Sequence, residues 1–221
     1  MTGLPNVEES YSAEVIRKSI HLCSLSIPII YYYITKSTAL TILIPLTLLF
    51  ALTDISRHLH SSIGEFYHKY FGWLLRAHER NQDARRLNGA TYVLLSASLC
   101  VWLFPKVIVI SAFAILIVSD TVAALIGRKY GKHPFLDKSL EGTAAFFVSA
   151  MIVVGIAPKV SDLPMEYLIG FVGALLGALV EAKSVAIDDN LSIPLSIGGV
   201  MWLLYGILLP AVDVFALDKL V

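Results

Sequence analysis

The feature that most limits the possible folds of this chain is a series of long apolar stretches along almost its whole length. A helix needs about 20 mostly apolar residues to cross the hydrocarbon core of a bilayer, or about 17 where flanking side chains reach the interface. Seven stretches are candidates: 19–35, 38–53, 89–104, 106–127, 143–157, 165–183 and 193–215. The sequence therefore predicts an all-α fold, a polytopic membrane bundle of about seven transmembrane helices.

Composition supports this class, because 57% hydrophobic and 15% charged residues are unusual in a water-soluble domain of 221 residues. The zero net charge gives no electrostatic reason to expect a nucleic acid partner. We expect one domain, 1–221, in which 54–88 forms an interfacial helix and loop. Apolar residues recur there every three to four positions, as in a helix lying on a membrane surface: Ile55, Leu59, Ile63, Phe66, Tyr70 and Leu74.

The basic residues predict the orientation. With the N-terminus inside, the inner segments hold thirteen of the seventeen Lys and Arg residues, as the positive-inside rule requires. The inner segments also hold most of the acidic residues that lie between spans. We therefore expect an integral membrane protein of the cell membrane in a prokaryote, or of the endoplasmic reticulum in a eukaryote, with its active site facing the cytosol.

Two carboxylates fall within predicted spans, Asp120 and Glu181. A charged side chain at membrane depth is costly, so it usually marks a functional site or a paired structural charge. Asp120 lies about two turns from the inner end of its helix, and Glu181 lies within a turn of it. The alternative for both is a structural ion pair with a neighbouring Lys or Arg.

The inner segment "DKSLEGTAAFF" places polar residues at the start of an apolar stretch. On a helix beginning near Asp137, Lys138 and Glu141 are three residues apart, and Ser139 and Thr143 are four apart, so they share adjacent faces. A helix N-terminus favours phosphate, and Glu141 there can bind Mg²⁺ or interact with the helix dipole. Alternatively, Ser139 is only an N-cap.

Two other inner segments carry suitable ligands. In "EAKSVAIDDNLSIP", two adjacent carboxylates and an amide suit Mg²⁺, although a solvated turn with a helix cap also explains them. Near the N-terminus, Glu14, Arg17, Lys18 and His21 share a helix face. Arg17 can fork a phosphate, whereas Glu14 and Lys18 can form an exposed ion pair of little energetic weight.

Four segments resemble, in order, the motifs of the CTP-dependent lipid kinases, which include dolichol kinase, phytol kinase and yeast-type diacylglycerol kinase. They are "EVIRKSIHL", "RRLNGATYVLLSA", "SDTVAALIGRKYGKHPFLDKSLEGTAAFF" and "EAKSVAIDDNLSIPL". The chain is also similar, more distantly, to the CDP-diacylglycerol synthases. The resemblance implies transfer of the γ-phosphate of CTP, with Mg²⁺, to the hydroxyl of a membrane lipid such as dolichol or another polyprenol, phytol or diacylglycerol.

The same resemblance implies residue roles. The catalytic candidates are Asp120, Lys138 and Glu141. The metal candidates are Asp120, Glu141, Glu181, Asp188 and Asp189. The residues expected to bind or enclose the nucleotide are Arg17, Lys18, His21, Asn88, Arg128, Lys129, Ser139, Gly142, Thr143 and Asn190. For Asn88 the alternative is a plain helix cap.

Two other functions remain to be distinguished from the kinase. A phosphatidate cytidylyltransferase would also use CTP and Mg²⁺, but the phosphate of its lipid substrate would attack the α-phosphate and release pyrophosphate. A membrane transporter would more often place polar residues at the midplane and show internal repeats or broken helices. The acidic residues here gather at one face, which favours an enzyme.

Overall fold

The computed structural model describes residues 7–59, 87–183 and 187–219, and the described chain is almost entirely helical. The helices are α1 (Val7–Cys23), α2 (Ser26–Tyr33), α3 (Lys36–Leu59), α6 (Gly89–Leu103), α7 (Lys106–Tyr130), α8 (Leu140–Ile156), α9 (Pro164–Ala182), α10 (Asp189–Leu208) and the short 3₁₀ helix η2 (Ala216–Lys219). The only strands in this part of the chain, β1 (Pro134–Phe135) and β2 (Lys138–Ser139), form a small antiparallel hairpin between α7 and α8. The predicted all-α class is confirmed.

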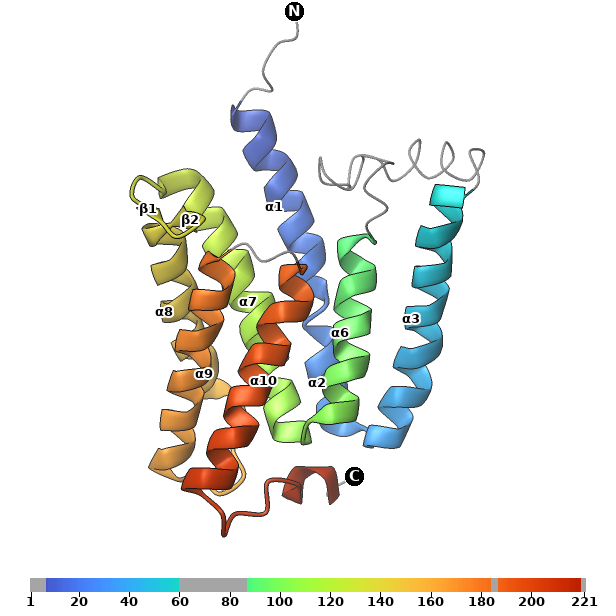
Figure 1. The fold of residues 1–221 in the computed structure, drawn as a ribbon, viewed down its shortest axis with the longest axis vertical. Coiled ribbons are helices and arrows are strands. Elements are labelled where there is room, and N and C mark those ends of the chain that lie inside the picture. The colour runs from blue at the N-terminus through green and yellow to red at the C-terminus, as the bar shows by residue number, and fades with distance from the viewer. Residues whose placement is uncertain (1–6, 60–86, 184–186, 220–221) are drawn as a thin grey trace, which may run out of the picture.

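Helix α7 lies at the centre of the bundle (Figure 1). It packs against α8, α10, α1 and α2, and its apolar side chains Ile108, Phe113, Leu116 and Ile117 are fully buried. Helix α3 lies at the edge and packs against α6. The core is therefore built around one apolar helix that neighbours shield on several sides.

In the part of the chain that the structure describes, four helices are long and apolar enough to cross a membrane: α3, α7, α9 and α10. Helices α6 and α8 are also apolar but shorter, with 15 and 17 residues. These six helices coincide with six of the seven predicted stretches. The chain is thus a helical membrane protein, and the count of seven spans stays a prediction.

The first predicted stretch, 19–35, is not one helix, because α1 ends at Cys23 and α2 begins at Ser26. Pro28 explains the break. Proline has no N–H to donate to the carbonyl four residues earlier, and its ring would collide with that group, here on Ser24. The two helices still follow each other from the upper to the lower end of the bundle in Figure 1.

Glycines allow the close packing of α9 against its neighbours. A Cβ on Gly173 or Gly177 would lie 3.1 or 2.7 Å from side chains of α10, and a Cβ on Gly170 would lie 2.5 Å from Val154 of α8. The α9 backbone therefore fits directly against both neighbours. One turn after Gly177, this packing places Glu181 near the start of α10.

We call the upper end of the bundle in Figure 1 the charged end, because ion pairs and hydrogen bonds of buried carboxylates occur there. It contains the last turns of α7 and α9, the first turns of α6, α8 and α10, the hairpin, and α1. The interfacial helix predicted within 54–88 falls mostly on residues 60–86, which lie outside the described residues.

Candidate active site

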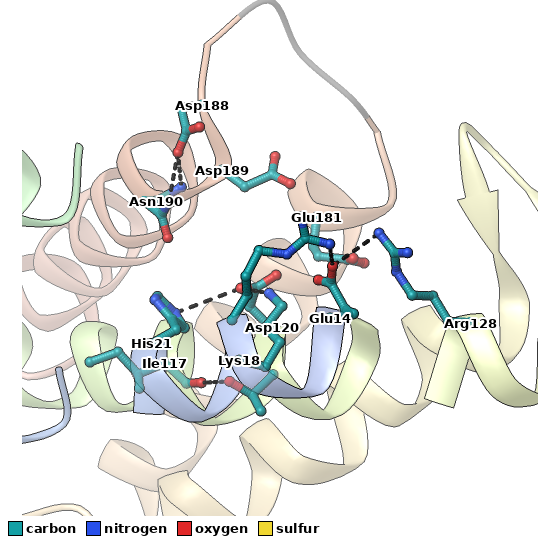
Figure 2. A network of polar contacts seen from close by, with 12 residues as sticks. Glu14, Lys18, His21, Ile117, Asp120, Arg128, Glu181, Asp188, Asp189 and Asn190 are labelled. Carbon is teal, nitrogen blue, oxygen red and sulfur yellow. Dashed lines mark hydrogen bonds and ion pairs between the residues drawn. The ribbon is translucent and has the colours of Figure 1, made fainter. Parts of the chain in front are cut away.

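Asp120 is the residue around which the charged end is arranged. It lies in α7 and is only 7% exposed. Helix α1 runs along α7, so that Lys18 donates a hydrogen bond to Asp120 Oδ2, and His21 Nε2 lies 3.7 Å from the same oxygen (Figure 2). Two residues three positions apart in α1 therefore lie over one buried carboxylate.

Glu14, one turn before Lys18, is also buried and makes a second link between α1 and α7. Its Oε2 accepts from Nη2 of Arg17 at 2.6 Å and lies 3.1 Å from Nη2 of Arg128 (Figure 2). Glu14 is 4% exposed, whereas the Arg128 side chain is 45% exposed. The carboxylate thus holds two guanidinium groups at the edge of the site, instead of forming an exposed pair with Lys18.

Lys138 joins three other elements. From β2, its Nζ donates to Glu181 Oε1 at the end of α9, at 2.7 Å, and to Asp189 Oδ2 at the start of α10, at 3.0 Å. Burial alone would lower the pKa of Lys138, but the carboxylates of Asp189 and Glu181 raise it above its ordinary value. Lys138 therefore stays protonated at neutral pH.

These two groups of contacts form one cluster. Asp120 interacts electrostatically with Lys138, and it also acts on Glu181 and Asp189. The three carboxylates come from α7, α9 and α10 and lie near one another (Figure 2). Three carboxylates and two ammonium groups, from Lys18 and Lys138, make a polar site at the end of a membrane bundle, in which Lys18, Asp120 and Glu181 are buried and Lys138 and Asp189 are partly exposed.

Several other predicted residues have local structural roles. Ser139 is the N-cap of α8, with its Oγ accepting from the Gly142 N–H at 3.2 Å, and the Thr143 hydroxyl donates to the Ser139 carbonyl. Helix α8 therefore begins at Leu140, later than the expected start near Asp137, because Lys138 and Ser139 are paired in the hairpin. The alternative of an N-cap at Ser139 is confirmed.

Asn88 and Asp188 also cap helices. The Asn88 side chain accepts from the Thr91 N–H, and its amide donates to Asp54 Oδ1 at 2.8 Å. Asp188 caps α10 and accepts from the backbone and the side chain of Asn190. Both residues lie at the charged end, and the cap role proposed as the alternative for Asn88 is present.

Glu141 faces the hairpin. It accepts from the backbone N–H groups of Lys132 and His133, at 3.1 and 3.3 Å, and lies 2.7 Å from the His133 ring. Lys129 is exposed, with its Nζ 5.3 Å from the centre of the Tyr130 ring. The contacts of Glu141 thus stabilise the hairpin that carries Lys138, whereas the contacts of Asp120 go to α1.

Within the described residues, no three His, Cys, Asp or Glu side chains are arranged to hold a metal ion by themselves. The donor set nevertheless fits Mg²⁺, which binds through one or two carboxylates together with the phosphates of a substrate. Glu181 Oε2 is buried and has no hydrogen-bond partner. The residues that would hold the ion together with substrate phosphates are Asp120 and Asp189, with Glu181 beside them.

At the end of the bundle that holds the candidate site, Glu14 and Asp54 are buried carboxylates that were not among the predicted site residues. Asp54 of α3 is fully buried and accepts from the Asn88 N–H, the Asn88 amide and the Thr91 hydroxyl, at 2.6–2.8 Å. In the sequence Asp54 only follows the end of a predicted span. Two sequence features could have indicated it: an acidic residue directly after an apolar stretch, and the helix-capping motif "NGAT" further along the chain, which supplies its hydrogen-bond donors.

Comparison with known proteins gives two relatives. The chain is 32% identical to the uncharacterized protein RP860 of Rickettsia prowazekii over 190 residues, which cover 85% of this chain and 93% of that protein. It is 28% identical to CTP-dependent diacylglycerol kinase 1 of Schizosaccharomyces pombe over 156 residues, 64% of this chain and 69% of the kinase. No family model and no solved structure matches. The chain therefore belongs to the same family as the Rickettsia protein, and it is a distant relative of a CTP-dependent lipid kinase.

Proposed function

We propose that this protein is a CTP-dependent lipid kinase that transfers the γ-phosphate of CTP to the hydroxyl group of a membrane lipid alcohol. The observation that carries the proposal is the cluster of Asp120, Glu181 and Asp189 around Lys138 and Lys18 at one end of apolar helices. The distant relation to the fission yeast diacylglycerol kinase supports the choice of donor and acceptor class.

The site suits phosphoryl transfer, which depends mainly on positioning and on charge stabilisation. Lys138, Arg17 and Arg128 are the cations available to bind the triphosphate, and Lys18 can move from Asp120 to a phosphate oxygen. Bound Mg²⁺ would neutralise part of the charge on the β- and γ-phosphates. Asp120 and Asp189 would then face the metal. Its positive charge would take the place of the ammonium groups of Lys18 and Lys138, their present partners.

The lipid hydroxyl must reach this cluster from the membrane side. Its oxygen forms the new bond to the γ-phosphorus, the bond from that phosphorus to the β–γ bridging oxygen breaks, and CDP leaves with the electron pair. Glu181 Oε2, buried and without a hydrogen-bond donor, is placed to accept the hydroxyl proton. The products are the lipid monophosphate and CDP.

The test is an assay of the purified protein with Mg²⁺ and either γ-labelled CTP or γ-labelled ATP. The acceptors are dolichol, a shorter polyprenol, phytol and diacylglycerol, and a parallel reaction contains phosphatidic acid with α-labelled CTP. We expect label to move from γ-labelled CTP to one alcohol. Label found only in a CDP-lipid would instead assign the protein to the cytidylyltransferases, and no transfer to any acceptor would contradict both enzymes.

A further inference from the structure

The turn of the hairpin contains a leucine in an unusual conformation. Leu136 has a φ of 51° and is 56% exposed. A left-handed backbone is unfavourable for a residue other than glycine, because its Cβ comes too close to the following carbonyl oxygen, and an exposed leucine also gives up the free energy of burial. Glycine or asparagine would satisfy this turn at lower cost, so the side chain itself needs an explanation.

Hydrogen bonds fix the turn from both sides. The Asp137 N–H donates to the carbonyl of Ala182 at the end of α9, at 3.1 Å, and the Leu140 N–H donates to the carbonyl of His133, at 2.9 Å. Glu141 accepts from the N–H groups of the segment before β1. These contacts fix the backbone on the C-terminal side of Leu136 and at the base of the hairpin, while Leu136 itself stays largely exposed.

The residues beside the hairpin combine exposed apolar and basic groups. Tyr130 is 52% exposed and Leu140 is 48% exposed. Lys129, directly before Tyr130, and Lys132, two residues after it, are also exposed. Apolar side chains together with lysines are typical of surfaces at the bilayer interface, where the lysines meet anionic headgroups. The segment also connects α7 and α8, two apolar helices, so it lies where the chain leaves the hydrocarbon region.

We propose that the hairpin is an interfacial membrane anchor. In it, Leu136 in the turn inserts among the acyl chains of the adjacent leaflet, the exposed Tyr130 and Leu140 at the two ends of the segment also meet lipid, and Lys129 and Lys132 contact anionic headgroups. The proposal does not depend on the kinase activity. Its consequence for the site is direct, because Lys138 follows Leu136 by two residues and contacts Glu181 and Asp189. The anchor would hold this lysine at a fixed depth relative to the membrane.

The first experiment measures depth. In a protein whose Cys23 and Cys100 are replaced by Ser and Ala, a nitroxide is attached at Leu136→Cys or, as the matched control, at the exposed Lys183→Cys. The labelled proteins are placed in phosphatidylcholine nanodiscs with and without phosphatidylglycerol. We expect the label at position 136 to meet oxygen more readily than a water-soluble nickel complex, and the label at position 183 to show the reverse.

Two results would overturn the anchor. Equal access of the nickel complex to both positions would place Leu136 in water. If the label at position 136 is shielded from both oxygen and the nickel complex, and only in discs that hold two copies of the protein, then another copy, and not lipid, covers it.

A second experiment separates anchoring from folding. The variant Leu136→Asn keeps a residue that tolerates the left-handed conformation and removes the apolar side chain. We expect its melting temperature in detergent to be unchanged or higher, while a nitroxide at Leu140→Cys becomes more accessible to the nickel complex. The proposal would fail if the melting temperature fell while the accessibility of the label at position 140 stayed the same. Leu136 would then stabilise the fold instead of anchoring the hairpin.

Discussion

Lys138 is the residue whose contacts tie the candidate site together, because its single ammonium group is shared by two carboxylates from different helices. We expect Lys138→Ala to lower the rate of CTP-dependent phosphorylation about 10²-fold or more, the usual effect of removing one positioned electrostatic group. Lys138→Arg, which keeps the charge, should retain a larger share of activity. The measurement is kcat with saturating CTP and the lipid identified in the acceptor assay.

The control for this variant is Lys183→Ala, since Lys183 is exposed at the same end of the bundle. Normal activity of Lys183→Ala beside a folded but inactive Lys138→Ala protein supports the site. Full activity of Lys138→Ala with an unchanged melting temperature would remove Lys138 from the proposed mechanism.

Glu14 is expected to act through its neighbours, because it touches Arg17 and Arg128 and lies one turn from Lys18. In Glu14→Gln the two guanidinium groups lose their shared carboxylate and are less well positioned. Loss of about 1 kcal/mol of binding, typical of such a pair, corresponds to a rise in KM for CTP of about fivefold. We expect kcat to change much less, and a fall in kcat at constant KM would contradict a positioning role.

At the level of single residues, helical spacing predicted which side chains share a face but not which partners they meet. The face with Arg17, Lys18 and His21 was visible in the sequence, whereas the contact of Lys18 with Asp120 joins residues 102 positions apart. Glu14 illustrates the limit. Its helical spacing from Lys18 predicted an exposed ion pair between the two residues. In the structure, packing of α1 on α7 buries Glu14 beside Arg128.

At the level of elements, apolar length predicted the positions of α3, α6, α7, α8, α9 and α10, but two ends differ: α3 continues past 53 to Leu59, and α10 ends at Leu208 instead of 215. Two features were missed for local reasons. Pro28 divides the first stretch into two helices, and the pairing of Lys138 with Phe135 delays the start of α8. Hydropathy averages over about 19 residues, so it does not register a single proline or a two-residue strand.

Two adjacent glycines in α10 provide a test of how closely the helices pack. A Cβ on Gly198 would lie 2.6 Å from the ring of Phe104, whereas a Cβ on Gly199 would meet nothing within 4 Å. We expect Gly198→Ala to destabilise the protein by about 1–3 kcal/mol, the usual cost of overpacking. Gly199→Ala should leave the melting temperature in detergent unchanged or raise it, because alanine is the better helix former.

The comparison needs only the two single variants and the parent protein under one set of conditions. Equal melting temperatures for both variants would show that the Phe104 ring moves aside freely, and that the contact of α10 with the end of α6 is looser than the structure describes.

For the whole molecule, the arrangement of the helices brings site residues together at one end from five elements: α1, α7, β2, α9 and α10. Helices α7 and α9 end there, while α8 and α10 begin there, so Asp120 meets Glu181 and Asp189, which lie more than 60 positions later in the sequence (Figures 1 and 2). The opposite end contains a different type of structure. There Glu166 accepts from three backbone N–H groups and from Tyr205, which closes the loop between α8 and α9.

This difference between the two ends gives a prediction about orientation. The distribution of Lys and Arg predicts that the charged end faces the cytosol. In a background without Cys23 and Cys100, Lys183→Cys and Ser161→Cys place one thiol at each end, both at exposed positions. In intact cells, a membrane-impermeant maleimide should label Ser161→Cys, and Lys183→Cys should react only after the cells are opened.

The reverse pattern would place the charged end outside and separate it from cytosolic CTP, which would contradict the proposed donor even if the helices cross the membrane as described. Labelling of both thiols in intact cells would indicate leaky cells or two orientations. A lysine variant at a third position, Lys132→Cys, distinguishes these cases, because it lies at the same end as Lys183 and must react together with it in any population of uniform orientation.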